Sequence, residues 1–500
     1  MNLHLLVALP VVTALFLLLL RDLRQIRLIA LIGSIVQLGA CCLLLDSYLD
    51  VRAAGITEPV LFKSSAAWFP SLGISFTTGV DGISLAMILL SALVVLAGVL
   101  VSWNTEHLPR EYFFLLMLLS AGAYGFFISL DLFTMFFFLE VAVIPKFLLI
   151  GVWGSGRKDA SALKLALMLM AGSALVFVGM LGLYFNSADS FGAHTFDLET
   201  LSMQAMSLNQ QLMFFPLLFI GFGIFGALFP FHTWVPDGHS SAPTAASMFL
   251  AGISMKLGGY GCLRVAAYLM PEAANYYAPV IITLAAIAVL YGAFATLMQT
   301  DLKYINAYSS VSHCGFVLLG IGMLNQTAIT GAILQMVSHG LMTALFFAAI
   351  GMLYQRTHTR MVSQLGGLLR FMPFISTVFV IAGLCSLGLP GLSGFVAEMT
   401  VFMGAWEKHD TLSRVATIAS CASIVVTAVY ILRATGKVIF GPVADAHHGE
   451  AGDACWNEKL AAGVLLAGIL IIGITPFLLT QLIQPDIERI MFNIGRDLAY

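Results

Sequence analysis

The stretch GALFPFHTWVPDGHSSAP, residues 226–243, interrupts an apolar run that would otherwise be long enough to cross a membrane. Each of its three prolines lacks a backbone N–H and clashes with the preceding turn, so a regular helix cannot continue through them. A second stretch, CSLGLPGLSGFVAE at residues 385–398, places Pro390 among glycines inside another apolar run. We therefore expect two membrane helices that are each broken into two pieces.

The rest of the chain has the composition of a membrane protein. Of its 500 residues, 60% are hydrophobic and 10% are charged, and its mean hydropathy is +0.96. Soluble globular domains do not have this composition. The apolar runs are continuous and do not alternate with a period of two, which excludes a transmembrane β-barrel. The composition predicts an all-α, polytopic membrane protein.

We count about fourteen apolar segments, most of them near the ~20 residues that cross a bilayer. The first has no basic region before it and no small-residue cleavage site, which indicates a retained helix. Residues 73–84, GISFTTGVDGIS, begin in the loop at 46–81 and predict a small hairpin. The segments lie at roughly 3–20, 28–45, 82–103, 111–129, 131–152, 161–186, 211–231, 245–270, 275–299, 302–323, 327–354, 374–405, 413–440 and 460–484.

The two broken helices, segments 7 and 12, lie five segments apart. This spacing suggests two inverted five-helix repeats, segments 4–8 and 9–13, and broken helices in paired repeats point to an ion pathway. We divide the chain into four parts. They are residues 1–110 with three helices and the outside hairpin loop, 111–270 and 271–440 as two half-channels, and 441–500 with an inner loop, the fourteenth helix and an outside tail.

The distribution of Lys and Arg predicts that both termini lie outside, which means the periplasm of a bacterium. With that orientation, fourteen of the 23 Lys and Arg residues fall on the inside and two lie within the membrane, and cytoplasmic loops are enriched in these cations. The outside cations are Arg52, Lys63, Arg264, Lys408, Arg414, Arg489 and Arg496.

We single out five ionisable residues within the apolar segments as a central line: Glu140, Lys256, His313, His339 and Glu398. A charge at mid-bilayer costs about 2.5–3.5 kcal/mol on insertion scales, so such residues are usually functional. Lys256 is too far from either helix end to extend its ammonium to the surface. The structural alternatives are a protonated, packed carboxyl for Glu140, an interfacial acid for Glu398 and hydrogen-bonded core histidines. Together the five residues predict a proton relay.

Three further lysines are possible members of the pathway. Lys146 lies about 9 Å from the inner end of its helix, so its side chain could reach the surface instead. It lies about 120° around the helix from Glu140, so the two cannot form an i,i+4 pair. Lys303 follows Asp301 at a helix start, where an interfacial anchor is the alternative. Lys164 begins segment six.

Five longer stretches resemble the antiporter-like proton-channel subunits of NADH-quinone oxidoreductase, respiratory complex I. The resemblance extends from the first segment to the fourteenth. It implies proton translocation coupled to electron transfer from NADH to quinone, with no redox chemistry on this chain. The stretches are FFFLEVAVIPKFLLIGVWGS (136–155), PFHTWVPDGHSSAPTAASMFLAGISMKLGGYG (230–261), DLKYINAYSSVSHCGFVLLGI (301–321), QMVSHGLMTALFF (335–347) and LGLPGLSGFVAEMTVFMG (387–404).

The resemblance also implies roles for single residues. Glu140 matches the family's glutamate of helix five, Lys256 its central lysine of helix eight, and Glu398 its acidic residue of broken helix twelve. His313 and His339 match polar positions that link the two half-channels. The family usually has a lysine in broken helix seven as the partner of the helix-five glutamate, and Phe225 stands at that position here. We hypothesise that Lys146 or Lys164 replaces it.

Cofactors and partners follow from the same resemblance. The seven cysteines include no CxxC pair, so we expect no iron–sulfur or zinc site and no other cofactor on this chain. FMN, iron–sulfur clusters and quinone would be bound by partner subunits. The expected partners are the antiporter-like L and N subunits and the lipid bilayer, with no nucleic acid, in a bacterial inner membrane. The alternatives are a subunit of a multi-subunit cation/proton antiporter, a membrane subunit of an energy-converting hydrogenase, and a structural scaffold.

Overall fold

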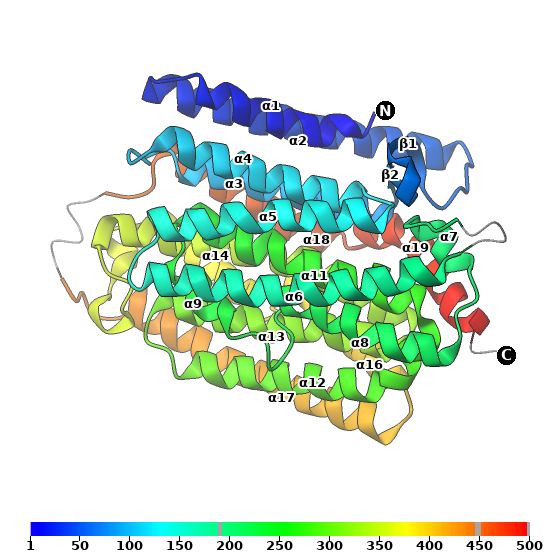
Figure 1. Cartoon of the computed structure of the whole chain (residues 1–500). Coiled ribbons are helices and arrows are strands. Elements are labelled where there is room, and N and C mark those ends of the chain that lie inside the picture. Colours follow the sequence, from blue (N-terminus) through cyan, green and yellow to red (C-terminus); the bar gives the residue numbers. More distant parts are fainter. Residues whose placement is uncertain (1, 189–192, 446–451, 498–500) are drawn as a thin grey trace.

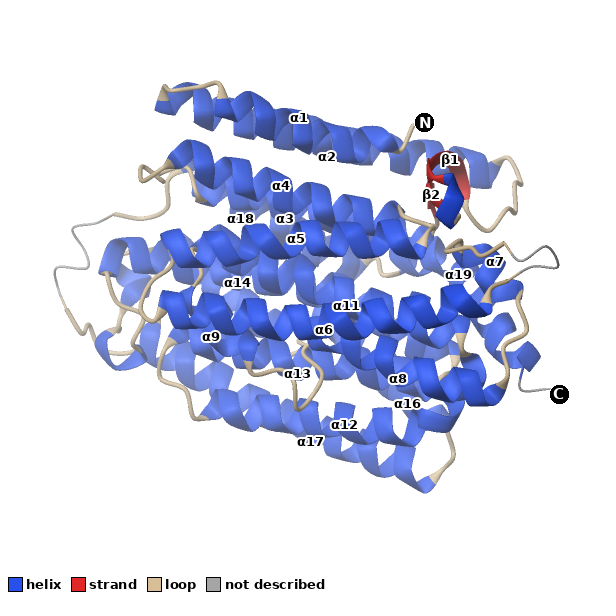
Figure 2. Ribbon diagram, viewed as in Figure 1, coloured by secondary structure: helices blue, strands red, loops and turns tan. Residues whose placement is uncertain are grey.

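The computed structural model describes residues 2–188, 193–445 and 452–497 as a bundle of helices that run side by side (Figures 1 and 2). The N-terminal half contains α1 (His4–Leu18), α2 (Leu23–Ala53), α3 (Gly82–Val101), α4 (Pro109–Ile128), α5 (Leu132–Trp153), α6 (Lys158–Asn186), α7 (Leu198–Met203), α8 (Leu208–Phe225), α9 (Trp234–Ser241), α10 (Thr244–Phe249), η2 (Leu250–Ser254), α11 (Met255–Gly261) and η3 (Cys262–Ala267). The C-terminal half contains α12 (Pro271–Leu297), α13 (Leu302–Met323), α14 (Gln326–Thr357), η4 (Val362–Gln364), η5 (Leu368–Arg370), α15 (Pro373–Ser386), α16 (Ser393–Glu407), α17 (Thr411–Val438), α18 (Trp456–Ile474) and α19 (Phe477–Asp497).

Ten helices in the described part of the chain are long and apolar enough to cross a membrane, and α1 and α15 are shorter apolar helices. A mostly helical, multi-pass membrane protein is therefore confirmed. Each of the fourteen predicted apolar segments overlaps at least one helix of the described chain. Helix α19 is not among the ten candidate spans.

Both helices that the prolines and glycines predict to be broken are interrupted. Helix α8 ends at Phe225 and α9 begins at Trp234. Helix α15 ends at Ser386 and α16 begins at Ser393, and Gly388 and Gly391 between them have positive φ angles. The helix that follows the first break is also irregular, since η2 and η3 are π-helical turns on either side of α11. Irregular backbone at membrane depth is tolerated where it is buried in protein or lines a cavity.

One end of the bundle carries the small sheet. Strands β1 (Leu61–Phe69) and β2 (Ile74–Val80) form an antiparallel hairpin, as the loop sequence predicted. Helices α7 and α19 lie at the same end, and both ends of the described chain are found there (Figure 1). We call this end the hairpin face. Lys63 of β1 binds Glu199 of α7 at 2.6 Å, and the ammonium lowers the pKa of that carboxyl.

Glycine permits the closest approach beside the first break. A Cβ added to Gly258 of α11 would lie 2.2 Å from the backbone nitrogen of Gly226 and 2.6 Å from the carbonyl oxygen of Phe222. Both neighbouring atoms belong to backbone at the end of α8, so they cannot rotate away. The bare backbone of Gly258 therefore sets how closely α11 packs against the broken helix.

We expect Gly258→Ala to destabilise the protein by about 1–3 kcal/mol, the usual cost of overpacking a core. Thermal unfolding and the yield of assembled protein measure the effect. Gly463→Ala in α18 is the matched control, because nothing lies within 4 Å of its added Cβ. Equal stability of the two variants would show that the α8–α11 contact can relax.

Candidate functional site

Four buried side chains from four helices form a continuous line. The Nζ of Lys256 lies 2.9 Å from Nδ1 of His339. The His339 ring stacks on the His313 ring, with their centroids 5.3 Å apart. The Nδ1 of His313 lies 3.3 Å from Oε1 of Glu398. All four residues are at most 5% exposed, so the structure brings together four of the five ionisable residues that the sequence placed inside the membrane.

The irregular helices position the two ends of this line. Lys256 lies on α11 between the π-helical turns, and its ammonium also donates to the carbonyl oxygen of Ala251 in η2. Glu398 lies on α16, one turn beyond the second break. A Cβ on Gly388 would lie 2.8 Å from Oε2 of Glu398, so glycine at the break lets the carboxyl approach the backbone.

Neutral polar side chains surround His313, and the sequence reasoning did not single them out. The Nε2 of His313 lies 3.0 Å from the hydroxyl of Ser386, the last residue of α15. The amide of Gln335 lies 3.1 Å from Nδ1 of His313. The hydroxyl of Tyr430 donates to Ser309, which in turn lies 3.3 Å from Ser386. Hydroxyl and amide groups that hydrogen-bond to the ring nitrogens can orient an imidazole and set its tautomer.

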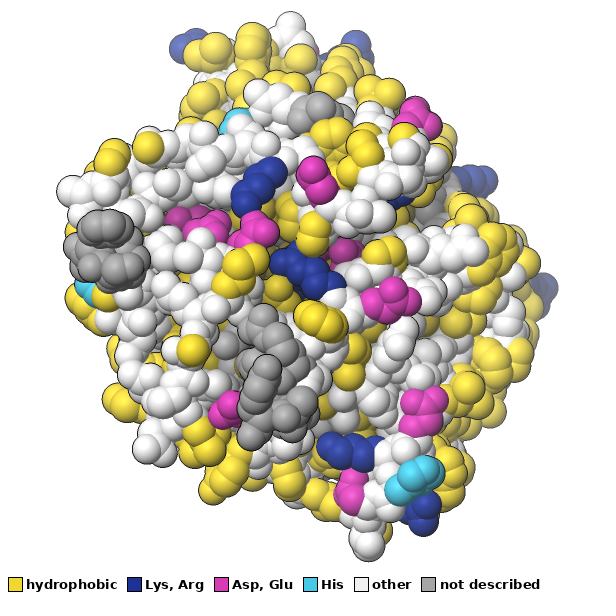
Figure 3. Space-filling view, turned by 90° about the vertical axis from the view of Figure 1, so that its right-hand side faces the viewer, with side chains coloured by type: hydrophobic (Ala, Val, Ile, Leu, Met, Phe, Trp, Pro, Cys, Tyr) yellow, Lys and Arg dark blue, Asp and Glu magenta, His cyan; other side chains and the backbone are white. Residues whose placement is uncertain are grey.

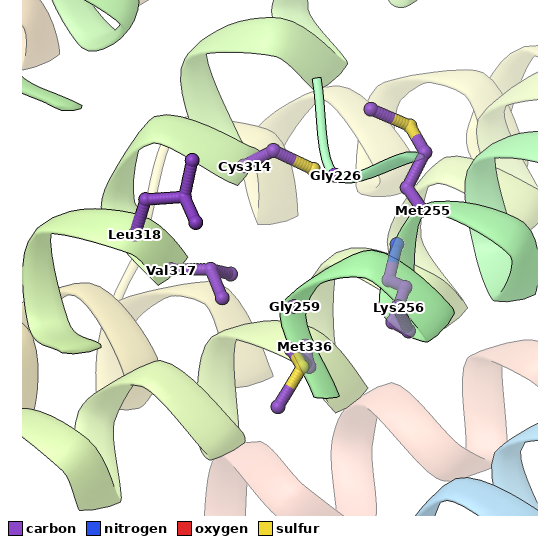
Figure 4. Close-up of a pocket in the computed structure, with 8 residues that line it drawn as sticks. All are labelled: Gly226, Met255, Lys256, Gly259, Cys314, Val317, Leu318 and Met336. Atoms are coloured by element: carbon purple, nitrogen blue, oxygen red, sulfur yellow. The ribbon is translucent and has the colours of Figure 1, made fainter. Parts of the chain in front are cut away.

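A small cavity of about 10 Å³ lies beside Lys256, close to the smallest volume that holds one water. Gly226 at the first break forms one wall, while Met255, Lys256 and Gly259 come from α11 (Figure 4). Its other walls are formed by Cys314, Val317 and Leu318 of α13 and Met336 of α14. The cavity therefore connects the broken backbone with the buried ammonium.

Glu140 lies apart from this line. It is half-buried on α5, and among the described residues nothing forms a hydrogen bond with its Oε1. Lys146 on the same helix is completely buried, and its ammonium also has no hydrogen-bond partner in the described part of the chain. The interpretation that Lys146 extends to the surface is therefore wrong. Its Nζ lies 5.8 Å from the centre of the Phe225 ring, and an ammonium near an aromatic face gains a modest attraction.

The other two lysines have different environments. Lys164 forms an ion pair with Asp237 of α9 at 2.7 Å, with 39% of its side chain exposed. Lys303 is buried, and its ammonium donates to the carbonyl oxygen of Ala242 at 2.6 Å. Ala242 lies in the short link between α9 and α10, so Lys303 of α13 is bound to the region of the first break and is not an interfacial anchor.

His239 on α9 is a further buried ionisable residue that sequence reasoning did not select. Its side chain is fully buried, and neither ring nitrogen has a hydrogen-bond partner among the described residues. The ring stacks on Phe347 with 5.6 Å between centroids. The sequence did contain a signal for this residue, because His239 lies in the PDGHSSAP stretch just before α10 begins.

Broken membrane helices beside a buried line of ionisable groups define a class of protein, the ion-translocating membrane proteins. The comparisons with known proteins agree with this class. The family described as NADH:quinone oxidoreductase/Mrp antiporter, TM, matches residues 129–427, and the chain belongs to this family.

The relatives cover most of the sequence. The chain is 37% identical over 483 residues to NAD(P)H-quinone oxidoreductase chain 4 1 of Synechococcus sp. (strain JA-3-3Ab), which covers 95% of this chain and 90% of the relative. It is 36% identical over 445 residues to NAD(P)H-quinone oxidoreductase chain 4-2 of Synechocystis sp. (strain ATCC 27184 / PCC 6803 / Kazusa), covering 87% of this chain and 77% of that relative. The resemblance that the five stretches indicated is confirmed.

Solved structures show the same fold. A chain of respiratory complex I from Thermus thermophilus superposes with a TM-score of 0.88 at 26% identity, covering 99% of this chain and 100% of that chain. A chain of the Mrp complex from Dietzia sp. DQ12-45-1b superposes with a TM-score of 0.84 at 20% identity, covering 98% and 97%. The second likeness, at this low identity, describes the fold alone.

Proposed function

We propose that this chain translocates protons as a membrane-arm subunit of an NADH-quinone oxidoreductase, respiratory complex I, in the position of chain 4, also called chain M. The observation that carries the proposal is the continuous buried line Lys256–His339–His313–Glu398. Each of its members can gain or lose a proton, and each contact is short enough for the charge of one group to change the proton affinity of the next.

The line supports a relay between the two halves of the bundle. A proton on Lys256 leaves its ammonium, and the adjacent Nδ1 of His339 can accept it. The positive charge on His339 then lowers the proton affinity of the stacked His313, whose proton passes to Glu398, while Ser386 and Gln335 fix the orientation of the His313 ring. The cavity beside Lys256 gives water a place to deliver the next proton.

Glu140 and Lys146 are proposed as the entry-side pair. Both are on α5, and Glu140 is the acidic group whose charge acts on Lys146. Lys146 adjoins Phe225, which occupies the position where the resembling family has its helix-seven lysine. We propose that Lys146, and not the surface-paired Lys164, supplies the displaced positive charge. Lys303, bound to the first break, is proposed as an inner-side member of the same pathway.

The finer topology is proposed on the same basis. It comprises fourteen spans, with inverted repeats formed by segments 4–8 and 9–13, and both termini outside the inner membrane of a bacterium. Residues 1–110, 111–270, 271–440 and 441–500 then serve as N-terminal helices, two half-channels and a C-terminal unit. The loop at 441–459 lies partly outside the described residues. The hairpin face is the outer side in this arrangement.

The partners are proposed to be the other membrane-arm subunits, including the antiporter-like L and N subunits. Apolar side chains are exposed around Glu140 on α5 and α6, among them Phe137, Ile144 and Leu167. A half-buried carboxyl in an apolar face is costly to expose to lipid. Contact with another membrane subunit therefore fits this face better than contact with lipid alone. FMN, iron–sulfur clusters and quinone are proposed to reside on partner subunits, with none on this chain.

A subunit of a multi-subunit cation/proton antiporter is the second candidate. The observation that favours it is the fold shared with a chain of the Mrp complex, together with the family description that includes Mrp antiporters. An antiporter needs the same buried charges, so the residues of the line do not separate the two functions. Their partners do.

Purification of the intact complex in its native membrane separates these functions. If the proposal is right, this chain copurifies with NADH-oxidising flavin and iron–sulfur subunits, and the reconstituted complex acidifies vesicles when NADH and quinone are supplied. Copurification with small membrane subunits only, with ion-driven proton exchange and no NADH response, would establish the antiporter instead.

A further inference from the structure

A second group of buried ionisable side chains lies near the hairpin face, outside the line described above. Asp81 precedes α3, Arg264 lies in η3 and Asp486 lies on α19. The Nη2 of Arg264 binds Oδ2 of Asp81 at 2.6 Å. All three residues are at most 6% exposed. Three segments that are distant in sequence therefore meet at one buried ionic cluster.

Both carboxylates of this cluster bind the first turn of α3. Oδ1 of Asp81 accepts a hydrogen bond from the backbone N–H of Ser84 at 2.8 Å. Oδ2 of Asp486 accepts one from the N–H of Ile83 at 3.1 Å. Gly82 makes this approach possible, because a Cβ there would lie 1.9 Å from the carbonyl oxygen of Leu482. The two carboxyl groups therefore share one helix N-terminus.

The charges of the cluster do not balance when both carboxyls are ionised. One guanidinium faces two carboxylates, which leaves a net negative charge in a buried place, and binding one proton removes it. Burial and the charge of Asp81 raise the pKa of the Asp486 carboxyl well above its ordinary value, while Arg264 opposes the shift. Because Asp486 lies on the amphipathic α19, the proton would be held outside the candidate membrane spans.

Other ionisable groups also face the cluster. The guanidinium of Arg264 lies over the rings of Tyr260 and Tyr268, and Tyr48 of α2 interacts with both carboxyls and binds Arg52. Helices α12 and α14 pack against α19 as well. The first turn of α12 contains one acidic side chain, that of Glu272. Helix α14 has no ionisable side chain between Gln326 and Ser338. Within these elements Arg264 is the cation that contacts Asp81 directly, and its charge also acts on Asp486.

A small cavity of about 20 Å³ lies between Arg264 of this cluster and residues at the hairpin face, which is room for about one water. Arg264 and Arg489 both line it, and among the described residues the Nη1 atoms of both are buried without a hydrogen-bond partner. Tyr268, whose hydroxyl binds Arg489 at 2.9 Å, and Glu199 add further polar groups to the wall. A cavity with several free polar partners is suited to water. Figure 3 shows acidic and basic side chains gathered near the centre of this face.

We propose that Asp81 and Asp486, with Arg264 paired to Asp81, form a proton-binding site that holds one exchangeable proton and exchanges it with the hairpin face through this cavity. The site is distinct from the Lys256–Glu398 line. Its use as the place where a translocated proton is released rests on the proposed function, whereas its ability to hold and exchange a proton does not.

Infrared difference spectra of the intact complex between acid and alkaline pH test the binding site. The carbonyl-stretch signal of one protonated carboxyl is expected to be present in the wild type and lost in Asp486→Asn. It should persist in Glu488→Gln, a matched change of an exposed carboxyl on the same helix. Asp81→Asn, expected to remove the same signal, serves if Asp486→Asn does not assemble. Identical spectra for wild type and both asparagine variants would overturn the proposal.

Transfer into D2O tests the route. The isotope shift of that carboxyl signal is expected to slow in Leu198→Trp, which fills the cavity wall, and not in Met203→Trp, an exposed position on the same short helix. An unchanged exchange rate in Leu198→Trp would refute the route.

NADH-driven pumping by Asp486→Asn tests the release role. Loss of pumping with electron transfer retained supports the role, and wild-type pumping overturns it. A wild-type complex that does not pump would contradict the proposed function while leaving the infrared result intact.

Discussion

Lys256→Ala is expected to abolish proton pumping by the chain. The substitution removes the ammonium that contacts Nδ1 of His339 at 2.9 Å, and alanine cannot carry a proton. Positioned proton-transfer groups contribute on the order of 10²-fold or more to rates, so we expect a loss of at least that size in the step through this chain. The fold should survive, because a buried ammonium is itself costly to desolvate.

Acidification of inverted membrane vesicles after NADH addition measures the effect, with the oxidation rate of NADH recorded in the same sample. Lys459→Ala provides the control, since this lysine is exposed on α18. Pumping at the wild-type ratio of protons to electrons in Lys256→Ala would show that the buried line carries no protons.

Lys146→Ala is expected to have the second largest effect and Lys164→Ala almost none. Lys146 is buried without a hydrogen-bond partner among the described residues, beside Phe225 and on the helix of Glu140. Lys164 makes a half-exposed ion pair with Asp237, and such pairs contribute only ~0–1 kcal/mol to stability. The same vesicle assay should show pumping lost in Lys146→Ala and retained in Lys164→Ala.

A charge swap makes this prediction sharper. The double variant Lys146→Leu with Phe225→Lys moves the ammonium from α5 to the neighbouring position at the end of α8. The family usually has its lysine at that position. Restored pumping in the double variant would show that the two positions share one role. Wild-type pumping in both Lys146→Ala and Lys164→Ala would refute the idea of a replacement lysine, and loss in Lys164→Ala alone would assign the role to Lys164.

The sequence predicted the class of fold because lipid leaves few choices. Long apolar runs must form helices, and proline and glycine within them must break those helices. The breaks after Phe225 and Ser386 were therefore visible in advance. The mid-segment positions of Lys256, His313 and His339, and the place of Glu398 after the second break, also indicated a buried pathway. The order of their contacts depends on which helices are neighbours, and no local pattern contains that information.

The errors and omissions have similar physical causes. Distance to the helix end suggested that Lys146 could reach the surface, but neighbouring helices bury it. Arg264 counted as an outside cation because it lies near the end of its segment, although it binds Asp81 inside the protein. Asp486 lies in a tail that looks like any amphipathic segment. His239, Gln335 and Ser386 become important only through residues that are far away in the sequence.

The π-helical turns around Lys256 have a mechanical consequence. Each π-helical turn contains one residue more than an α-helical turn. The extra residue can pass from one turn to the other while both ends of the helix stay in place. If η2 closed to regular α-helix while η3 absorbed the residue, α11 would advance by one position and rotate by about 100°. The ammonium of Lys256 would then move away from His339, and the contact that begins the relay would be broken.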